Sequence, residues 1–532
     1  MSATTLFDAI FTNERELQRA VDYAGREITY GELRAETIRA AEVFHALGLE
    51  TGERVAILLN DSPEFIAAFV AIQSLGAIAV PINTGLSVAE QQVILNDCTP
   101  RAVIVEAGLC NTLLTAAGDR LRYLKDTLVV GRGQELPWQQ RVNHFLRVKR
   151  EIPRIEGVSA QLFEQAPRQA LGSEFPAQPG DATPAFILYT SGSTGEPKGA
   201  VHCQADVFHT NETFCRQVLR LRQSDRLFSS SRLPFAYGLG NSFSFPLLNG
   251  FTSILCFEKP TPEVISRIFS ENRPTIFFGV PVVYNLLLEH HRLVKEIDCS
   301  SLRLCISAGE ALPARLGEEW ERAFGLKVLD GIGSTEMLHM WMSNLEDAVR
   351  YGSSGNLLEG YEARLLDEQD NATPADAEGH LWVKGNSAAL GYWGRPEVTA
   401  RTFVDGWVRT GDLYARDRDG YWFHLGRSDD CFKSSGQWVS PVEVEGVLLR
   451  CPGVGRAAVV EDFDQDGLPC ACAFVVREAV ESSAGKLEED LRQLTKTALP
   501  RFKRPRRFLF VKELPYTATG KIQRFKLREQ LR

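Results

Sequence analysis

The sequence predicts an α/β protein: a large N-terminal domain of two helix-covered, mostly parallel sheets plus a distorted β-barrel, then a small α+β domain. The chain has 532 residues, too many for one hydrophobic core. Short apolar runs alternate with helical segments from residue 54 to residue 329, which is typical of parallel sheets covered by helices. After Glu362 the segments become short and alternate apolar with polar residues, as antiparallel strands do.

Composition and charge narrow the classes of function. Hydrophobic residues make up 44% of the chain and charged residues 24%, as in soluble globular proteins. The formal charge of −9 argues against a nucleic acid or an anionic membrane as the main partner. The eleven cysteines form no C-x-x-C pair, the nine histidines show no H-E-x-x-H spacing, and neither a secretory leader nor a membrane-spanning apolar run is seen. We therefore expect a cytoplasmic protein with reduced thiols.

The first β-α-β unit sets the pattern. Arg54–Leu59 is an apolar run and predicts a strand. Ser62 can cap a helix and Pro63 suits its first turn, so Glu64–Leu75 is expected to be an amphipathic helix. Gly76–Pro81 then returns as a strand.

The same alternation continues to residue 329. Further strands are expected at Ala102–Val105, Thr127–Val130, Ser253–Cys256, Thr275–Gly279, Leu302–Ile306 and Lys327–Leu329. Helices are expected at Pro262–Ser270, Val282–Glu289 and Pro313–Phe324. Residues 131–184 are the least regular and are interpreted as a surface excursion with room for one helix. Ligands of such sheets bind beyond the carboxyl ends of the strands, where the polar loops of this chain fall.

The C-terminal part is predicted to differ in type. The short barrel strands are expected at Glu362–Leu366, His380–Lys384, Trp407–Val408, Tyr414–Arg416 and Tyr421–His424. Mixed elements follow at Pro441–Arg450 (helix), Arg456–Val460 and Cys470–Val476 (strands), Leu487–Leu499 (helix) and Arg507–Val511 (strand). We place the domain boundary near Asp429, which gives domains 1–428 and 429–532.

The stretch Tyr189–Gly199 carries the first chemical signal. It packs small hydroxyls, three glycines and Lys198 into eleven residues between two apolar runs. Exposed N–H groups, hydroxyls and one lysine suit phosphate oxygens. It is not a Walker A loop, because Pro197 precedes the lysine and Gly199 follows it. Taken alone, the stretch is either a phosphate loop or a polar hairpin tip.

Five further stretches share this polar, glycine-containing character. Two of them are expected at strand-to-helix turns, where backbone N–H groups are available to a ligand. The five are Ser307–Pro313, Asp330–Glu336, Arg409–Asp412, Gly426–Gly436 and Leu514–Arg524.

In this order and at these separations the six stretches resemble the adenylate-forming superfamily of acyl-CoA synthetases, adenylation domains and luciferases. The resemblance covers essentially the whole chain. Within the superfamily, Leu233–Asn241, Gly333–Met340 and Trp438–Pro441 look most similar to benzoate-type aryl-CoA ligases. The resemblance implies that a carboxylate attacks the α-phosphate of ATP to give an acyl-adenylate and pyrophosphate, and that a thiol then expels AMP. The first step brings two anions together, so it needs charge neutralisation and positioning.

The resemblance also implies roles at the nucleotide. Glu336 would bind Mg²⁺, Thr335 would donate to the α-phosphate, Asp412 would accept the ribose hydroxyls, and Arg427 would support the ribose or phosphate. The β- and γ-phosphates would be held by Thr190, Ser191, Gly192, Ser193, Thr194, Gly195 and Lys198. The adenine slot would be formed by Gly309, Glu310, Ala311, Asp330, Gly331, Ile332 and Gly333. The alternatives are a solvated turn lysine for Lys198, a helix-capping glutamate for Glu336 and a turn carboxylate for Asp412.

The small domain is implied to be mobile. Lys521 would reach the α-phosphate and carboxylate as a catalytic cation, although an ordinary surface lysine is the alternative. Asp429 would be the hinge about which this domain swings. Another face of the domain, with Lys433 to Gly436, would then meet the site for thiol transfer by CoA. The basic run Arg501–Arg507 is interpreted as a solvated face, with contact to CoA phosphates as the alternative.

The acid pocket is implied to be a flat slot suited to an aromatic ring rather than a long fatty acid. Its residues would be Ala236, Tyr237, Gly279, Gly333, His339 and Met340. His339 could hydrogen-bond a ring substituent or simply pack. Met340 and Trp341 depart from the residues that often follow this histidine, which leaves room for a substituted benzoate such as 2-aminobenzoate or hydroxybenzoate.

The expected function is thus an ATP-dependent aryl-acid CoA ligase that uses ATP, Mg²⁺ and CoA and acts as a monomer or homodimer. The alternative acceptor is a carrier-protein pantetheine, which would have to come from another chain. A non-catalytic adenylate-binding relative is a different class, and the intact Lys198, Glu336, Asp412, Arg427 and Lys521 speak against it. Luciferase-type oxygenation is not excluded by the motifs.

Overall fold

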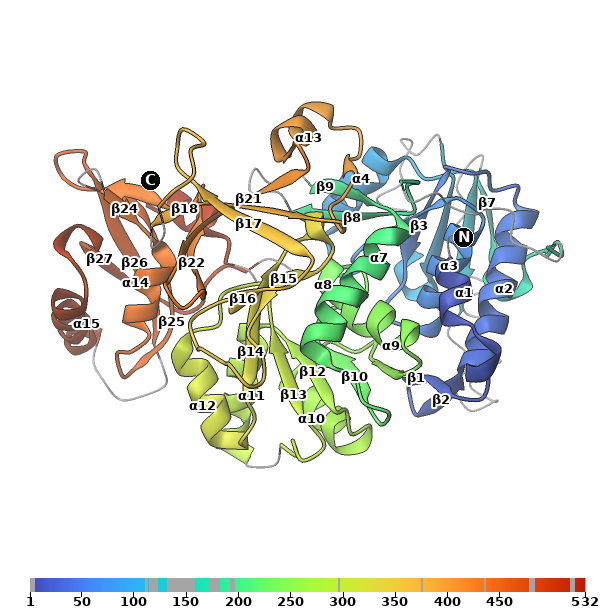
Figure 1. Ribbon diagram of the computed structural model, residues 1–532, viewed down its shortest axis with the longest axis horizontal. Helices are drawn as coiled ribbons and strands as arrows, with labels where there is room; N and C mark the ends of the chain where they lie inside the picture. Colours follow the sequence, from blue (N-terminus) through green and yellow to red (C-terminus); the bar gives the residue numbers. More distant parts are fainter. Residues whose placement is uncertain are drawn as a thin grey trace.

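The computed structural model describes residues 5–110, 113, 123–131, 158–171, 182–191, 197–294, 297–374, 377–434, 437–477, 484–516 and 522–531. Two large, mostly parallel sheets lie side by side, an antiparallel sheet packs beside them, and the C-terminal part forms a separate body (Figure 1). The predicted fold class is therefore confirmed. Among the described helices, none combines the length and the apolar character needed to cross a membrane.

The first large sheet has eight strands. In spatial order they are β19 (Gly391–Tyr392), β9 (Pro197–His202), β8 (Phe186–Ser191), β4 (Ile78–Pro81), β3 (Arg54–Leu58), β5 (Ala102–Glu106), β6 (Asp126–Val130) and β7 (Ser159–Leu162). The six strands from β8 to β7 are parallel, and β9 and β19 continue the sheet in antiparallel register. The strand β7 extends the sheet inside the region interpreted as an excursion, which corrects part of that interpretation.

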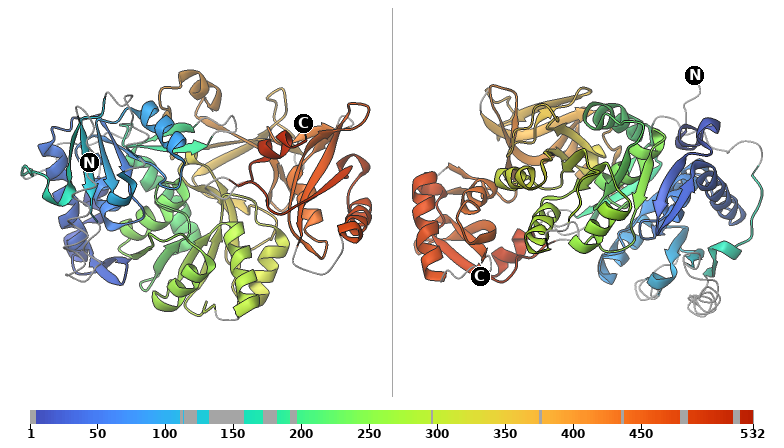
Figure 2. Two further views of the ribbon diagram at one scale, coloured as in Figure 1. Left: turned by 180° about the vertical axis from the view of Figure 1, so that it is seen from behind. Right: turned by 90° about the horizontal axis from the view of Figure 1, so that it is seen from below.

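Helices α2 (Tyr30–Ala46), α3 (Pro63–Ser74) and α4 (Val88–Cys98) accompany this sheet. Ser62 caps α3 by accepting from the N–H of Phe65, as predicted. The predicted amphipathic character of this helix is wrong, since all its residues except Glu64 are buried. The reason is that α3 lies in a core shared by both large sheets, since Val55 of β3 and Val21 of β1 belong to the same hydrophobic cluster. Figure 2 shows the blue N-terminal part and the green middle part of the chain side by side.

The second large sheet has nine strands. They are β16 (Asn356–Leu357), β15 (Met340–Ser343), β14 (Val328–Gly333), β13 (Leu304–Ser307), β12 (Ile276–Gly279), β10 (Arg226–Ser229), β11 (Thr252–Leu255), β1 (Arg19–Tyr23) and β2 (Arg26–Thr29). Its six central strands, β14 to β1, are parallel. The sequence had not predicted the β1–β2 hairpin.

The two faces of this sheet have different covers. Alternate residues such as Phe228 and Phe277 pack under α10 (Pro262–Glu271), α11 (Pro281–Val294) and α12 (Ala314–Phe324). Their neighbours Leu227 and Phe278 face a second core. A π-helix Asn211–Leu219 and Phe245 of α9 (Phe245–Leu248) contribute to that core. The helices α7 (Gln204–Thr210) and α8 (Ala236–Leu239) and a π-helix Gly240–Ser244 contribute buried residues to the core shared by both large sheets. The remaining short N-terminal and peripheral elements are α1 (Leu6–Ile10) and 3₁₀ turns at Asn13–Arg15, Ala107–Leu109 and Phe163–Gln165.

The antiparallel sheet has five strands. They are β17 (Tyr361–Leu366), β18 (Glu378–Gly385), β20 (Phe403–Val404), β21 (Trp407–Arg416) and β22 (Trp422–Arg427), with α13 (Pro396–Thr402) between β19 and β20. Two predicted strands are in fact one, because β21 runs without a break through Arg409–Asp412. The polar stretch between the two predicted strands therefore lies within one strand, where Asp412 pairs with Arg427 of β22.

The C-terminal body has its own cores, whose members begin at Phe432. Its elements are β23 (Phe432–Ser434), β24 (Gln437–Val439), α14 (Pro441–Leu448), β25 (Val454–Phe463), β26 (Pro469–Arg477), α15 (Ala484–Ala498), a 3₁₀ turn Arg501–Lys503, β27 (Arg507–Val511) and α16 (Arg524–Glu529). The sequence missed the β23–β24 hairpin. A separate C-terminal body agrees with the prediction, while the boundary at Asp429 stays a prediction.

Candidate active site

The glycine-rich stretch connects two paired strands, as predicted. β8 and β9 are antiparallel neighbours, with Thr190 opposite Lys198 and Ser191 opposite Pro197. The loop residues Gly192, Ser193, Thr194 and Gly195 lie outside the described residues. The Lys198 ammonium lies 5.7 Å from the centre of the Tyr392 ring, a cation–π distance.

The turn that carries Thr335 and Glu336 is shorter than predicted. The stretch Asp330–Gly333 continues β14, and only a 3₁₀ turn, Thr335–Met337, follows before β15. The expectation that a helix opens here is wrong, because the chain turns back to pair antiparallel with β14. The turn at Glu336 is therefore too short to supply an appreciable helix dipole.

Hydrogen bonds from the first large sheet hold the backbone of this turn. A ring nitrogen of His202, Nε2, lies 2.8 Å from the carbonyl oxygen of Thr335. The other ring nitrogen, Nδ1, lies 2.7 Å from a carboxylate oxygen of Asp206, and the His202 side chain is fully buried. The N–H of Ala389 donates to the carbonyl of Glu336 at 2.8 Å. The two sheets are thus tied together at the turn.

The Glu336 side chain is held separately. The hydroxyl of Tyr392 donates to Oε1 of Glu336 at 2.6 Å. Burial and the neighbouring Glu336 raise the pKa of Tyr392 far above its usual range, so the hydroxyl stays a donor. Tyr392 therefore contacts the cation of Lys198 with its ring and the carboxylate of Glu336 with its hydroxyl.

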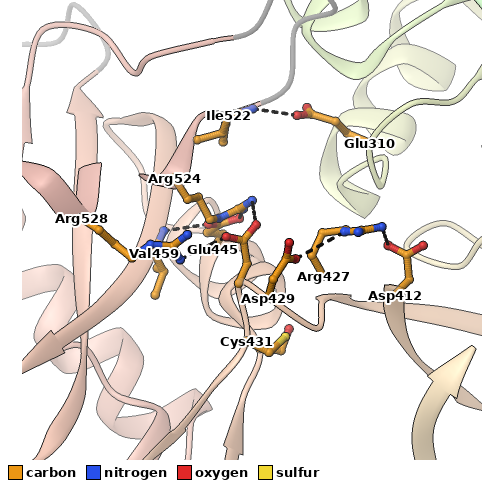
Figure 3. A network of polar contacts seen from close by, with 12 residues as sticks. Glu310, Asp412, Arg427, Asp429, Cys431, Glu445, Val459, Ile522, Arg524 and Arg528 are labelled. Carbon is orange, nitrogen blue, oxygen red and sulfur yellow. Dashed lines mark hydrogen bonds and ion pairs between the residues drawn. The ribbon is translucent and has the colours of Figure 1, made fainter. Parts of the chain in front are cut away.

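Asp412 and Arg427 form the adjacent charged pair. Figure 3 shows Arg427 between Asp412 and Asp429, with nitrogen-to-oxygen distances of 3.5 Å to each carboxylate. Burial lowers the pKa of Arg427, but the carboxylates of Asp412, Asp429 and Glu336 outweigh it and raise the pKa overall. Nε2 of His424 lies 3.3 Å from Oδ1 of Asp412 and orients it.

The C-terminal body contacts the core beside this cluster. The backbone N–H of Ile522 donates to Oε1 of Glu310 at 3.2 Å (Figure 3). Arg524 anchors the same segment through two bonds to the Glu445 carboxylate, at 2.8 and 2.9 Å. Lys521, the residue before Ile522, lies outside the described residues.

The predicted adenine slot is formed by the loop after β13 and by β14. Gly309 has a φ of +93°, a conformation that favours glycine, and Glu310 and Ala311 follow it. The N–H of Leu312 donates to Oδ2 of Asp330 at 3.2 Å. Burial raises the pKa of Asp330 to about 8, so this carboxyl is largely protonated at neutral pH. Gly331 and Ile332 pair with β15 and are brought close to the loop by the parallel β13–β14 register.

The residues of the predicted acid pocket come from α8, the ends of β12 and β14, the turn before β15 and the first residue of β15. Ala236 and Tyr237 begin α8, and the Tyr237 hydroxyl donates to the carbonyls of Gly279 and Ile306 at 3.4 and 3.3 Å. The Tyr237 ring lies 5.5 Å from the His339 ring, measured between centres. The structure therefore brings the tyrosine, the glycine and the histidine together, while their role as an acid pocket stays a prediction.

His339 is surrounded by rings and is 3% exposed. The ring centres of Phe214 and Phe245 lie 4.6 and 4.7 Å from the centre of the His339 ring. Nε2 of His339 lies 3.2 Å from the amide oxygen of Asn241. Burial lowers the pKa of His339 to about 3, so the imidazole is neutral at physiological pH. A neutral imidazole orients or packs a ring and supplies no charge.

Glycines allow β14 to approach this histidine. A Cβ on Gly333 would lie 2.5 Å from the carbonyl oxygen of His339, and a Cβ on Gly331 would lie 2.4 Å from Cε of Met340. Both distances are shorter than real contacts. Met340 is buried at 1% exposure, so its side chain is part of the wall.

Lys433 does not join the cluster in this conformation. Its ammonium pairs with Oε1 of Glu368 at 2.5 Å, away from the Glu336 turn. Of the residues after Lys433 that were predicted to meet the site for thiol transfer, Ser435 and Gly436 lie outside the described residues. The conformation is therefore one in which the Ile522 side of the C-terminal body, and not the Lys433 side, contacts Glu310.

Mg²⁺ fits the donor set around Glu336. In the described part of the chain no three or more His, Cys, Asp or Glu side chains could together hold a metal ion. A single carboxylate such as that of Glu336, supplemented by phosphate oxygens and water, is the arrangement that Mg²⁺ prefers with nucleotides.

Sequence reasoning missed the residues that support the predicted ones. These are Tyr392, His202 with Asp206, His424 and Asn241. His202 ends β9, and Asp206 lies four residues later in the first turn of α7. This spacing could have been recognised in the sequence. Tyr392 gave no such signal, since it lies 56 residues from Glu336 in the chain.

Comparisons with known proteins agree with this geometry. Two family models match the chain: "AMP-binding enzyme" over residues 11–393 and "AMP-binding enzyme C-terminal domain" over residues 443–521. The chain is 39% identical over 510 residues to the benzoate–CoA ligase of Thauera aromatica, which covers 96% of this chain and 92% of the relative.

Two solved structures are similar over nearly the whole chain. One is the anthranilate CoA ligase AuaEII in complex with anthranoyl-AMP, with a TM-score of 0.89 and 35% identity, covering 100% of this chain and 98% of that one. The other is a benzoate CoA ligase from Burkholderia xenovorans LB400, with a TM-score of 0.84 and 37% identity, covering 97% of each chain.

Proposed function

The chain belongs to the AMP-binding enzyme family, and we propose that within this family it activates aromatic carboxylic acids as CoA thioesters. It is an AMP-forming aryl-acid CoA ligase. In the first half-reaction the aryl carboxylate attacks the α-phosphate of ATP, which breaks the bond to the bridging oxygen and releases pyrophosphate. In the second, the thiol of CoA attacks the acyl carbon and AMP leaves.

One observation carries the proposal. Lys198, Glu336, Arg427 and Asp412 gather at one place, although they come from four separate stretches of the chain. The ring-lined His339 follows Glu336 by only three residues in the chain. A charged end for a nucleotide beside an apolar end for an aromatic ring is the arrangement that aryl-adenylate formation needs.

At the nucleotide we assign the roles that the contacts support. Asp412, held by Arg427 and His424, accepts the ribose hydroxyls. Thr335, whose carbonyl is fixed by His202, donates its hydroxyl to the α-phosphate. Thr190, Ser191 and Lys198 flank the loop that holds the β- and γ-phosphates. Gly309 to Ala311 and Asp330 to Gly333 form the adenine slot.

Glu336 is the residue that would hold Mg²⁺. When bound, the ion supplies charge neutralisation between phosphate oxygens. Glu336 itself contributes a carboxylate whose other oxygen is fixed by Tyr392, so its orientation is set before the ion arrives.

Lys521 is assigned to the adenylation half-reaction. The contact between Ile522 and Glu310 supports this role, because it places the residue after Lys521 at the nucleotide end. Domain 429–532 would then rotate about Asp429, whose carboxylate contacts Arg427, relative to domain 1–428. Rotation would replace Lys521 by the Lys433 face for thiol transfer.

The substrate is proposed to be benzoate or a benzoate with a small ring substituent, such as 2-aminobenzoate. The relatives named above act on benzoate and anthranilate. The slot would be formed by Ala236, Tyr237, Gly279, Gly333, His339 and Met340. Transfer to a carrier-protein pantetheine is not favoured, since these relatives are CoA ligases that match over nearly their full lengths. A cytoplasmic monomer or homodimer completes the proposal.

The proposal is tested by product stoichiometry. Purified protein is given ATP, Mg²⁺ and benzoate or 2-aminobenzoate, with CoA supplied or withheld. We expect one aryl-CoA, one AMP and one pyrophosphate per turnover with CoA, and at most one adenylate per protein without it. Repeated pyrophosphate release without CoA, or no thioester by mass spectrometry, would contradict the assignment.

A further inference from the structure

Tyr392 contacts two oppositely charged residues of the candidate site. It lies in none of the sequence stretches from which that site was predicted. Its ring face lies 5.7 Å from the Lys198 ammonium, and its hydroxyl donates to Glu336 at 2.6 Å. In the described residues, no other side-chain hydrogen bond to the Glu336 carboxylate is found. The tyrosine therefore contacts both the Lys198 ammonium and the Glu336 carboxylate.

The backbone around Tyr392 is fixed from both sides. Tyr392 pairs with Ala200 of β9, and its own N–H donates to the Thr399 hydroxyl at 2.9 Å. The neighbouring Trp393 donates to the carbonyl of Gly199 at 2.8 Å. The ring is 9% exposed and packs edge-on against Phe403. A side chain held this firmly can orient a carboxylate.

The same short segment also holds the backbone of the Glu336 turn. Ala389 donates to the Glu336 carbonyl, three residues before Tyr392 donates to the Glu336 side chain. Because β19 pairs with β9, this segment moves with the strand that carries Lys198. The phosphate-loop lysine and the Glu336 carboxylate thus share one support.

We propose that Tyr392 is a positioning residue for adenylation, which fixes the Glu336 carboxylate for the magnesium form of ATP and supports Lys198 beside it. The inference rests on the proposed function, because it presumes that MgATP binds at Glu336. The hydroxyl acts on Glu336 and the ring on Lys198, so the two contributions can be separated by substitution.

The test is ATP binding by calorimetry, with Mg²⁺ or with EDTA and without acid. Tyr392→Phe removes the hydroxyl and keeps the ring, so MgATP affinity should fall about 10-fold while metal-free ATP affinity stays within about 2-fold. Tyr392→Leu also removes the ring and should weaken metal-free ATP binding as well. Tyr351→Phe is the matched control, because its hydroxyl donates to Glu321 at 2.8 Å far from the site, and it should leave both affinities unchanged.

A double-mutant cycle separates positioning from a general structural effect. In a Glu336→Gln background, Tyr392→Phe should cause no further loss of MgATP affinity if it acts through that carboxylate. An equal loss in both backgrounds, or wild-type or tighter MgATP binding by Tyr392→Phe alone, would overturn the proposal. If Tyr392→Phe lowers Tm by more than the control, the affinities of the cycle are measured at a temperature at which every variant is folded, and the same outcomes decide.

A half-reaction distinguishes this inference from the proposed function. Thiol transfer from pre-formed aryl-adenylate to CoA needs no pyrophosphate site, so Tyr392→Phe should perform it at the wild-type rate. Failure of the wild type to convert aryl-adenylate would refute the proposed function. Impaired conversion by Tyr392→Phe, with normal conversion by the wild type, would refute the assignment of Tyr392 to adenylation.

Discussion

The two ends of the candidate site are held together by different forces. At the nucleotide end, charges face one another: Arg427 pairs with Asp412 and Asp429, and Glu336 is hydrogen-bonded by Tyr392. At the aryl end the contacts are rings and glycines, and burial keeps the imidazole of His339 neutral.

The difference shows which part of the chemistry is general and which is selective. The charged end needs groups at defined positions around phosphates and a ribose, so its residues are set by hydrogen bonds that span the two sheets and the C-terminal body. The aryl end must match the shape of a ring, so its geometry is set by close packing. One added methyl group is enough to disturb such packing. Substitutions at one end should therefore leave the other end's substrate largely unaffected.

The largest expected effect is at Lys521. Lys521→Ala should lower the rate of adenylate formation about 1,000-fold, because it removes the cation that we propose stabilises the transition state. Thiol transfer from pre-formed aryl-adenylate should be unchanged. The two half-reactions are measured separately, by pyrophosphate release and by aryl-CoA formation. The exposed Lys512→Ala is the control. Near-normal adenylation by Lys521→Ala would show that the charged end works without it.

The next effect is expected at Asp412. Asp412→Asn removes the charge that pairs with Arg427 and that we propose accepts the ribose hydroxyls, so KM for ATP should rise about 10- to 100-fold. KM for the aryl acid should change by less than about 2-fold. Steady-state kinetics with each substrate varied in turn checks this, and the exposed Asp419→Asn is the control. An equal rise in both KM values would break the separation of the two ends.

The opposite selectivity is expected at Gly240. A Cβ there would lie 2.5 Å from Cδ2 of His339, so Gly240→Ala should push the ring and raise KM for benzoate about 10-fold while leaving KM for ATP unchanged. Gly446→Ala, where a Cβ meets nothing within 4 Å, should be neutral. A change in KM for ATP with no change for benzoate would place His339 outside the acid pocket.

The smallest effect is a pH dependence of stability from Asp330, a buried carboxyl of β14. The folded pKa of about 8 is above the unfolded value, so between pH 5 and pH 8 the unfolded state has lost a proton that the folded state keeps. The stability contribution of wild-type Asp330 therefore falls as pH rises, by roughly 1 kcal/mol per pH unit.

Asp330→Asn does not titrate, so its Tm relative to wild type should rise steadily from pH 5 to pH 8. Thermal unfolding of both proteins across that range checks the prediction. A difference in Tm that is constant with pH would mean that Asp330 is already ionised in the folded protein.

Much of the fold could be predicted because the chain alternates short apolar runs with helices. The failures have local causes. The helix α3 looked amphipathic but is buried by both large sheets, which no single helical pattern reveals. Asp330–Gly333 looked like a loop because it is glycine-rich, yet those glycines allow a strand to approach His339 and Met342.

The sequence could propose site residues only where they lie within contiguous motifs. Lys198, Glu336 and Asp412 could be read from short stretches. Their supports could not, because His202 lies 133 residues from Thr335 and meets it only when the two sheets pack. The sequence shows both partners of such a contact, but it does not show that they meet in the folded protein.

The most direct test of the account is acid-dependent ATP–pyrophosphate exchange across a panel of acids without CoA. The panel contains benzoate, 2-aminobenzoate, the hydroxybenzoates, acetate and a long-chain fatty acid. We expect exchange with the aromatic acids at least about 100-fold above that with the aliphatic ones, because only a flat ring fills the slot at His339. Exchange that is equal across the panel, or greatest with an aliphatic acid, would contradict the account.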